Sequence, residues 1–336
     1  MNDRGSMPVG APSGATARLA GDPAGLAEAA RLLRAGRLVA FPTETVYGLG
    51  ADATNPAAVT GIFDAKERPR FNPLISHLPD ATAARREGAL DRVAERLAEA
   101  FWPGPLTLVV PATPGTRVCD LARAGLPSLA LRVPASPLAH EFLAEVGRPV
   151  AAPSANRSGR VSPTRPEHVL ADLDGRIAAL LDGGATPVGV ESTVVACLGG
   201  RPRLLRPGGI TREALAEVLG QEVWSAEADD SARPIGPGLL ASHYAPRARV
   251  RLDARSIEAG DAALLFGPDS PGGLPKAAAS FNLSERGDLA EAAAALFSGL
   301  RRLDASGAAV IAVTPIPTTG LGEAINDRLR RAAAPR

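Results

Sequence analysis

The chain has 336 residues, which suffices for two domains of ordinary size, and 45% of them are hydrophobic against 22% charged. A formal net charge of +1 excludes the broad positive field that drives tight non-specific nucleic-acid binding, although a local basic face stays open. No apolar run approaches the ~18 residues of a membrane span, and residues 1–24 lack the apolar centre of a signal peptide. We therefore expect a cytoplasmic protein without a membrane segment.

Cysteine and histidine usage gives no sign of a metal or disulfide framework. Cys119 and Cys197 are the two cysteines, far apart and outside any Cys-x-x-Cys pair, and the four histidines show no His-x-x-x-His spacing. We expect two buried thiols, no metal held by the protein, and a reducing compartment. Lys66 and Lys276 are the only lysines, and neither follows a glycine, so the chain has no P-loop.

Alternating helices and strands are predicted from residue 25 to 212, after a Gly-, Ala- and Pro-rich tail at residues 1–24 that we expect to be disordered. The predicted helices cover residues 25–36, 56–66, 88–102, 136–146 and 166–172. The predicted strands cover residues 37–41, 73–78, 106–111, 128–134, 149–156 and 188–197, with a hairpin return at 201–210. This alternation is typical of an α/β domain.

Residues 213–247 contain several prolines and glycines and are predicted to be an interdomain linker. Residues 248–336 then form a second, smaller α/β unit. Its predicted strands include apolar runs at 250–254, 262–268 and 308–317, and its predicted helices cover 287–303 and 322–333.

Cations gather at the end of the predicted helix 56–66. Lys66, Arg68 and Arg70 are followed by Asn72, and Pro69 ends the helix. Compact ammonium and forked guanidinium groups at such a place could hold a polyphosphate. The alternative is a solvated charge run that the helix dipole favours, and the use of lysine in a nearly lysine-free chain weighs against that alternative but leaves both open.

Two polar loops follow predicted strands, where α/β sheets bind ligands. The first, residues 41–50, holds Thr43, Thr45 and Tyr47, and its glycines match a dinucleotide fingerprint only loosely because they lie far from the strand exit. The second, residues 152–164, contains Ser154, Asn156, Ser158, Gly159 and Ser162. Its hydroxyl and backbone N–H groups form either an anion nest or an ordinary polar loop.

Polar residues also interrupt apolar runs. Glu191, Ser192 and Thr193 lie in a predicted buried strand and need partners, which are either a ligand or each other. Arg132 and Arg206 each follow an apolar run, so each should pair with a substrate carboxylate or phosphate, or with an internal acid. No Ser-His-Asp or paired-carboxylate pattern is evident, which favours electrostatic clamping over covalent catalysis.

Seven of these stretches, taken in order, resemble one family. They are FPTETVYGLG, KERPRFNPLISHL, WPGPLTLVV, SLALRVP, APSANRSG, ESTVV and RPGG. Together they resemble the YrdC/Sua5 family of threonylcarbamoyl-AMP synthases, and GPGLLASHYAP and GLGEAINDRLRRAA resemble the linker and C-terminal domain of its long Sua5 form. The resemblance implies a YrdC-like twisted open mixed sheet with flanking helices, followed by a smaller Rossmann-like α/β domain.

The resemblance also implies a nucleotidyltransferase reaction. L-threonine, bicarbonate and ATP give threonylcarbamoyl-AMP and pyrophosphate, and a tRNA threonylcarbamoyl transferase takes the product to make threonylcarbamoyladenosine in tRNA. Threonine's amine captures CO2 as a carbamate, which attacks the α-phosphate. A Mg²⁺ ion is expected on the ATP phosphates, without a protein cage.

Site residues are implied position by position. Lys66 and Arg68 would be catalytic. The nucleotide side would comprise Lys66, Arg68, Asn72, Ser128, Ser154, Asn156, Ser162, Arg206 and Tyr244. The threonine side would comprise Thr45, His77, Arg132, Ala152 and Ser192, with Arg132 as the fork for the carboxylate. His77 could instead be a packed strand histidine, and Tyr244 could instead anchor the linker to a domain.

Two other functions compete with this one. An RNA-binding, translation-associated module without ATP turnover could use the same groove, and a weak tRNA contact stays open, but only 4% of residues are aromatic and they do not interleave with a basic patch. A carbamoyl-phosphate-using maturation enzyme would need Cys-rich zinc modules and further domains, for which two isolated cysteines do not suffice.

Overall fold

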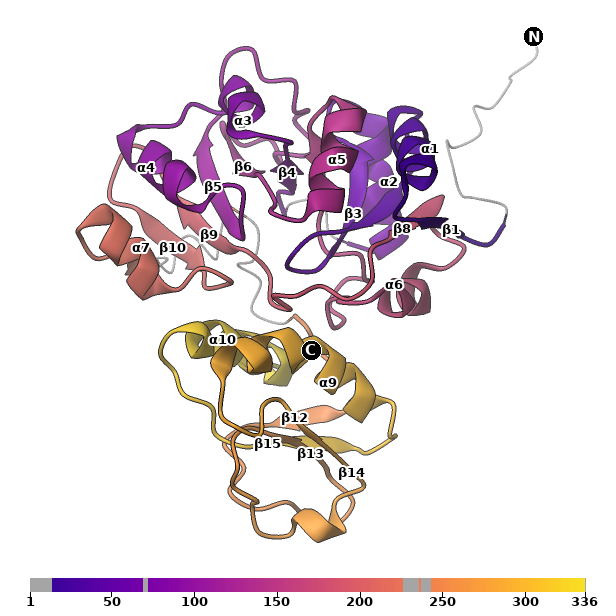
Figure 1. Cartoon of the computed structure of the whole chain (residues 1–336), viewed down its shortest axis with the longest axis vertical. Coiled ribbons are helices and arrows are strands. Elements are labelled where there is room, and N and C mark those ends of the chain that lie inside the picture. The colour runs from indigo at the N-terminus through magenta and orange to yellow at the C-terminus, as the bar shows by residue number, and fades with distance from the viewer. Residues whose placement is uncertain (1–13, 69–71, 226–235, 237–242, 336) are drawn as a thin grey trace.

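The computed structural model describes residues 14–68, 72–225, 236 and 243–335. A larger N-terminal domain lies against a smaller C-terminal domain (Figure 1). Pro69 and Arg70, expected at the end of a helix and near phosphate, lie outside the described residues, as do the first 13 residues and residues 226–235 and 237–242 of the expected linker.

The N-terminal domain is built on a mixed sheet. Its strands are β1 (Ala17–Ala20), β2 (Val39–Pro42), β3 (Tyr47–Asp52), β4 (Ile75–His77), β5 (Leu106–Pro111), β6 (Ser128–Arg132), β7 (Val150–Ala151), β8 (Ala179–Asp182), β9 (Thr193–Ala196), β10 (Arg203–Arg206) and β11 (Trp224–Ser225). Within the described residues the sheet has 11 strands in the order β1-β8-β2-β3-β7-β4-β6-β5-β9-β10-β11. The predicted mixed open sheet is therefore confirmed.

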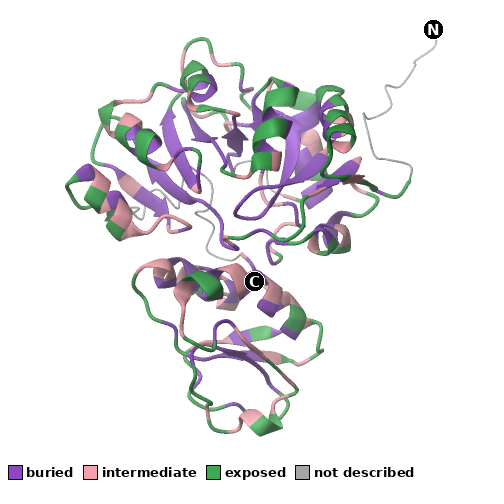
Figure 2. Cartoon of the chain, viewed as in Figure 1, coloured by how far each residue is buried: buried purple, intermediate pink, exposed green. Residues whose placement is uncertain are grey.

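Helices flank this sheet. They are α1 (Pro23–Arg34), α2 (Pro56–Lys66), α3 (Ala81–Glu87), α4 (Arg92–Phe101), α5 (Pro137–Val146), α6 (Pro166–Leu173) and α7 (Arg212–Leu219). α1 packs on α5 near one end of the sheet, and α4 packs on α7 near the other. Buried strands lie beneath the exposed outer faces of these helices (Figure 2), so the core lies between the sheet and its helices.

The strand β3 was expected to be a loop, and that prediction is wrong. Its two glycines obscured a strand that pairs with β2 on one side and β7 on the other. A Cβ at Gly50 would lie 3.1 Å from the ring of Phe41, and one at Gly48 would lie 3.2 Å from the Cβ of Ala152. Glycine is therefore needed here for close packing within a sheet, not for a dinucleotide turn.

Two predicted segment boundaries are also wrong. The expected disordered tail contains β1, which pairs in parallel with β8. The expected linker begins too early, because α7 and β11 belong to the first domain. Leu215 and Leu219 of α7 are buried in its core, and β11 pairs with β10.

Several predicted elements are shorter than expected. The predicted strands at 188–197 and 149–156 contain only β9 and β7, and the predicted helix at 88–102 begins later, at α4. The polar residues that follow β7 and precede β9 leave the sheet, which frees their side chains for other contacts. Those segments form much of the site described below.

The C-terminal domain is a parallel sheet covered by two helices on the side of the first domain (Figure 1). Its elements are β12 (Arg249–Arg251), β13 (Ala262–Leu265), the 3-10 helix η1 (Leu274–Lys276), β14 (Ala279–Asn282), α9 (Leu289–Asp304), β15 (Val310–Val313) and α10 (Leu321–Ala333). The sheet order is β12-β15-β13-β14, with every pairing parallel. This agrees with the predicted Rossmann-like unit.

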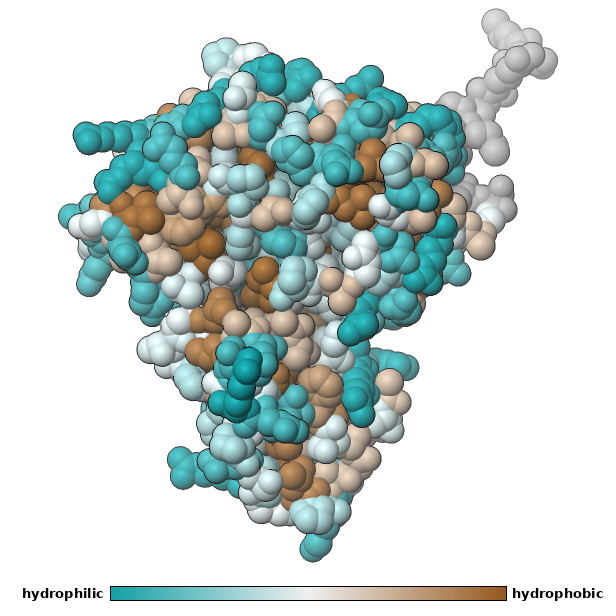
Figure 3. All heavy atoms as spheres, in the orientation of Figure 1, coloured by the Kyte–Doolittle hydropathy of each residue, from teal (hydrophilic) through white to brown (hydrophobic). Residues whose placement is uncertain are grey.

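The two domains share packed surface. Val46, Val161 and Val190 of the first domain join the buried cluster formed by α9 and α10. Hydrophilic residues cover most of the face shown in Figure 3, and hydrophobic residues lie there in separate groups. Among the described residues, none of the helices combines the length and apolarity needed to cross a membrane.

Candidate active site

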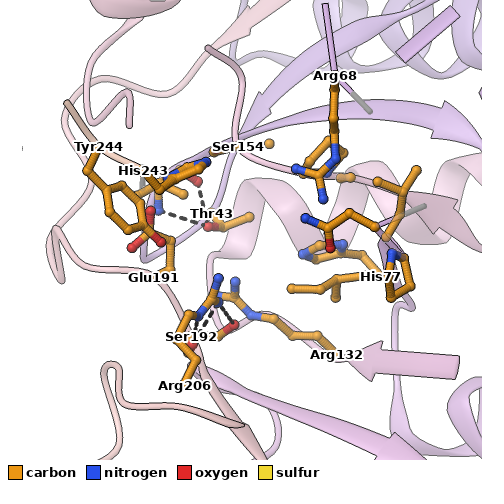
Figure 4. Close-up of a pocket in the computed structure, with 18 of the residues that line it drawn as sticks. Thr43, Arg68, His77, Arg132, Ser154, Glu191, Ser192, Arg206, His243 and Tyr244 are labelled. Atoms are coloured by element: carbon orange, nitrogen blue, oxygen red, sulfur yellow. Dashed lines mark hydrogen bonds between the residues drawn. The ribbon is translucent and has the colours of Figure 1, made fainter. Parts of the chain in front are cut away.

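A cavity lies where strand ends of the first domain meet the linker and helix α10. The lining residues come from stretches spread along both domains and are Thr43, Val46, Gly48, Arg68, Asn72, Pro73, Leu74, Ile75, His77, Arg132, Ala152, Pro153, Ser154, Glu191, Ser192, Arg206, His243, Tyr244 and Arg331. Figure 4 shows Tyr244 and Glu191 on one side of this cavity and His77 and Arg132 on the other.

Parallel strands β4 and β6 place His77 and Arg132 side by side, because these residues are register partners at the carboxyl ends of their strands. The Arg132 guanidinium is almost completely buried and donates to Glu44 Oε1 at 2.7 Å. Burial, together with the charge of Arg132, lowers the pKa of His77 to about 3. His77 is therefore a neutral imidazole beside a fixed cation, and its Nδ1 has no protein partner among the described residues.

Arg206 and Ser192 form a second clamp on the neighbouring strands. Arg206 donates from Nε and Nη2 to the Ser192 carbonyl oxygen at 3.1 and 2.8 Å, and from Nη2 to Ser192 Oγ at 3.1 Å. Ser192 Oγ also lies 2.7 Å from Thr107 Oγ1. Within the described residues Arg206 forms no ion pair with a carboxylate, so its charge is available to an anion in the cavity.

The loop that follows β7 is organised by Lys66. The Lys66 ammonium, which is fully buried, donates to the carbonyl oxygen of Ser154 at 2.5 Å and to that of Asn156. Asn156 in turn donates from Nδ2 to the carbonyl oxygens of Arg157 and Arg160, both at 2.8 Å. Burial and the nearby Arg68 hold the pKa of Lys66 well below its ordinary value. Lys66 thus holds the loop in shape and does not itself line the cavity.

Glu191 connects the cavity to the C-terminal domain. Its Oε1 accepts from Ser162 Oγ at 2.6 Å and its Oε2 accepts from Arg328 Nε at 2.7 Å. Burial acts to raise the pKa of Glu191, but the cations Arg328 and Arg206 outweigh it and lower that pKa to about 2. Glu191 is consequently a carboxylate at any physiological pH.

Arg328 is completely buried although it belongs to α10. It also donates to the carbonyl oxygen of Pro207 at 2.8 Å and lies 5.3 Å from the ring centroid of Tyr244. The Tyr244 ring stacks on Phe297 of α9 with centroids 5.6 Å apart. Tyr244 therefore both lines the cavity and anchors the linker to the second domain.

Nine of the residues implied by the sequence line one cavity. They are Arg68, Asn72, His77, Arg132, Ala152, Ser154, Ser192, Arg206 and Tyr244. The other five lie behind its walls: Lys66 and Asn156 shape the loop, Ser162 holds Glu191, Thr45 Oγ1 lies 2.8 Å from Thr43 Oγ1, and Ser128 starts β6. Their binding roles stay predictions.

Sequence reasoning named Glu191 without giving it a role, and it missed Glu44, Arg328 and Arg331. Glu44 follows the Thr43 turn and could have been paired with Arg132 by the rule that a buried arginine needs an acid. Nothing in the sequence of α10 indicates that its arginines face another domain.

Buried polar atoms without protein partners point into this region. Arg68 Nε, Asn72 Oδ1, His77 Nδ1 and His243 Nδ1 all belong to lining residues and have no hydrogen-bond partner among the described residues. Buried polar groups are normally satisfied, so donors and acceptors gathered in one cavity indicate a polar ligand there. The lining contains four arginines and one glutamate, which favours an anionic ligand.

The fold and this cavity define an α/β protein that has, at its strand ends, a positively charged site for an anionic ligand. A family profile described as "Telomere recombination" (Sua5, YciO and YrdC) matches residues 31–208, and one described as "Threonylcarbamoyl-AMP synthase, C-terminal domain" matches residues 210–334. The chain belongs to the family of threonylcarbamoyl-AMP synthases, in the long Sua5 form, as its motifs predicted.

Curated relatives agree over nearly the whole chain. The chain is 43% identical to threonylcarbamoyl-AMP synthase of Bacillus subtilis over 324 residues, covering 93% of each protein. It is 40% identical to that of Pyrococcus abyssi over 328 residues, covering 91% of this chain and 93% of the relative. The crystal structure of P. abyssi Sua5 complexed with L-threonine superposes with a TM-score of 0.85 at 36% identity, covering 95% of this chain and 97% of that one.

Proposed function

We propose that this protein makes threonylcarbamoyl-AMP from L-threonine, bicarbonate and ATP, releasing pyrophosphate, as the first step of threonylcarbamoyladenosine formation in tRNA. The observation that carries the proposal is the single cavity that gathers the buried cation Arg132, the neutral His77 and the two further cations Arg68 and Arg206. A zwitterionic amino acid and a polyphosphate are ligands that such a lining can hold together.

The threonine subsite would lie at the ends of β4 and β6. Arg132 would bind the threonine carboxylate through its forked donors, while Glu44 behind it keeps the guanidinium in place. His77 stays neutral near physiological pH, so it can accept or donate one hydrogen bond without adding charge. That P. abyssi Sua5, which shares this fold, was crystallised with L-threonine supports L-threonine as a ligand.

The nucleotide subsite would lie between Arg68, Arg206 and the loop around Ser154. The threonine nitrogen would form a C–N bond with CO2 and lose a proton, giving a carbamate, and bicarbonate would supply that CO2 with loss of water. A carbamate oxygen would then attack the α-phosphorus while the bond to the β-phosphate bridge oxygen breaks. The arginines stabilise the charge on the departing pyrophosphate, and Tyr244 helps to exclude water from the labile carbamate.

Magnesium would be carried by the phosphates. Among the described residues there is no cluster of three His, Cys, Asp or Glu side chains that could hold a metal ion. The one lining carboxylate, Glu191, is already held by Ser162 and Arg328. These residues fit an ion that reaches the site on ATP and water, where it would neutralise phosphate charge.

The product would pass to a tRNA threonylcarbamoyl transferase, in the cytoplasm. Threonylcarbamoyl-AMP is a mixed anhydride that water hydrolyses, so an acceptor enzyme must consume it promptly.

The test is pyrophosphate release by the purified full chain. We expect release from ATP only when both L-threonine and bicarbonate are present, with threonylcarbamoyl-AMP detected by mass spectrometry. Release that ignores either co-substrate, or no release by folded protein, would overturn the proposal. Salt-dependent tRNA binding without turnover would point instead to an RNA-binding module.

A further inference from the structure

We propose that Arg331 of the C-terminal domain binds the polyphosphate of the nucleotide, so that helix α10 supplies one residue of the active site. This inference rests on the proposed function for the identity of its ligand. It assigns to the second domain a direct contact with substrate, in addition to its packing against the first domain.

The position of Arg331 in the cavity suits it to contact a ligand there. Arg331 lines the same cavity as Arg68 and Arg206, and its side chain is 15% exposed. The Arg331 Nε donates to Asp327 Oδ1 at 3.1 Å, and the Arg331 carbonyl oxygen accepts from the backbone N–H of His243 at 3.3 Å. The side chain is thus held by its own helix and the backbone by His243, which lines the cavity, and these contacts fix where the guanidinium lies.

The distribution of charge in the cavity favours an anion. Arg132 is paired with Glu44, Arg331 with Asp327 and Glu191 with Arg328, which leaves Arg68 and Arg206 as the other lining cations. Among the residues that the structure describes, these two form no ion pair. Burial lowers the pKa of Arg206, and the charges of Arg328 and Arg331 add to that effect, while Tyr244 and Glu191 act to raise it. Cations that repel one another within a small buried space are favoured only when an anion joins them.

The orientation of Lys66 reduces the positive charge that the first domain directs to the phosphates. A triphosphate carries about four negative charges at neutral pH, and the motifs of the first domain offer three nearby cations. One of these, the Lys66 ammonium, is directed to the carbonyl oxygens of Ser154 and Asn156. Among the described residues, the first domain therefore directs Arg68 and Arg206, but not Lys66, to the lining beside Arg132, and Arg331 adds a guanidinium from α10.

The helix itself provides a matched control. Arg330 precedes Arg331 and is exposed, so replacing it removes the same charge from α10 without touching the cavity. Arg331→Met keeps the length of the aliphatic stem, and Arg331→Lys keeps the charge but loses the fork. The three variants separate local binding from the net charge of the helix.

The experiment is calorimetric titration of the full chain with three probes: ATP with Mg²⁺, inorganic pyrophosphate alone, and L-threonine alone. For Arg331→Met we expect the Kd for ATP and for pyrophosphate to rise about tenfold (about 1.4 kcal/mol). The Kd for L-threonine should stay within about twofold, since Arg132 is untouched. The Kd values of Arg331→Lys for ATP and pyrophosphate should lie between those of the wild type and Arg331→Met. Those of Arg330→Met should equal the wild-type values.

Two results would overturn the inference. One is unchanged ATP and pyrophosphate affinity in Arg331→Met. The other is a parallel loss of L-threonine affinity with a lowered unfolding midpoint, which would make Arg331 a structural residue. The proposed function fails separately, through absence of turnover in the wild type. In that case a tenfold loss of pyrophosphate binding would still support an anion site on α10.

Discussion

Two buried guanidinium–carboxylate pairs border the cavity, and they are arranged in opposite directions. In the pair Arg132–Glu44 the arginine lines the cavity and the glutamate stands behind it, both within the first domain. In the pair Arg328–Glu191 the glutamate lines the cavity and the arginine stands behind it, on the second domain. We call Arg132–Glu44 the inner pair and Arg328–Glu191 the outer pair. The inner pair presents a cation to a ligand, whereas the outer pair joins the two domains.

This difference separates substrate binding from assembly. Breaking the inner pair should act first on a ligand carboxylate, and breaking the outer pair should act first on folding and domain contact. A buried pair is costly to break because the remaining charge stays out of water. Variants of each pair therefore separate the two roles.

Arg328→Met should give the largest loss. It leaves Glu191 buried with Ser162 as its remaining side-chain donor, so we expect the free energy of unfolding to fall by about 3–5 kcal/mol. Urea unfolding followed by circular dichroism measures this. The double variant Arg328→Met/Glu191→Leu should recover part of the loss, because no charge is stranded. A single-variant loss below about 1 kcal/mol would show that the outer pair does not hold the domains.

Arg132→Gln should act on threonine. We expect its Kd for L-threonine to rise about a hundredfold (about 2.8 kcal/mol), because a charge-assisted contact to a carboxylate is lost. The double variant Arg132→Gln/Glu44→Gln no longer buries an unpaired carboxylate. It should bind L-threonine as weakly as Arg132→Gln does, but its free energy of unfolding should be higher than that of Arg132→Gln. Wild-type threonine affinity in either variant would remove Arg132 from the threonine subsite.

Lys66→Met should slow turnover through the loop. Loss of the ammonium frees the carbonyl oxygens of Ser154 and Asn156, so we expect pyrophosphate release to fall by more than about tenfold (~1.4 kcal/mol in the barrier). L-threonine binding should change little, because Lys66 lies outside that wall. Equal losses of threonine and nucleotide binding would contradict this prediction, because they would indicate that Lys66 supports the whole site and not this loop alone.

The acid sensitivity of folding should depend on Glu191. Its pKa in the folded protein is about 2, below the ordinary value of 4.5, so its carboxylate stabilises the fold above pH 4.5. That contribution is lost as the pH falls from 4.5 towards 2, because the proton then binds the unfolded chain more tightly. Glu191→Gln should therefore show a shallower decline of unfolding free energy over this window. Identical slopes would contradict the assignment.

Sequence predicted regular elements well where local signals were strong. The helix at 56–66 was predicted with the observed bounds, because Asn55 caps it and Pro56 starts it. The strand β3 was missed because its glycines are required by close packing against residues of neighbouring segments, which the local sequence does not show. Local pattern cannot report such packing.

The site residues were likewise predicted where local motifs contained them and missed where distant segments meet. The motif resemblance identified Arg68, His77, Arg132 and Arg206, which the fold brings to one cavity. It did not indicate that the Lys66 ammonium is held by the loop, nor that α10 reaches the cavity with Arg331. The Lys66 contacts join residues 88 and 90 positions apart within the first domain. The place of Arg331 depends on how the two domains meet, and in neither case does a short window of sequence contain both partners.

The most direct measurement is titration of L-threonine into the two variants Arg132→Gln and Arg328→Met, without nucleotide, at a temperature where both stay folded. If the inner pair serves the ligand and the outer pair serves assembly, Arg132→Gln loses about a hundredfold in affinity and Arg328→Met loses at most a few-fold. Equal losses in the two variants, or a greater loss in Arg328→Met, would contradict the account.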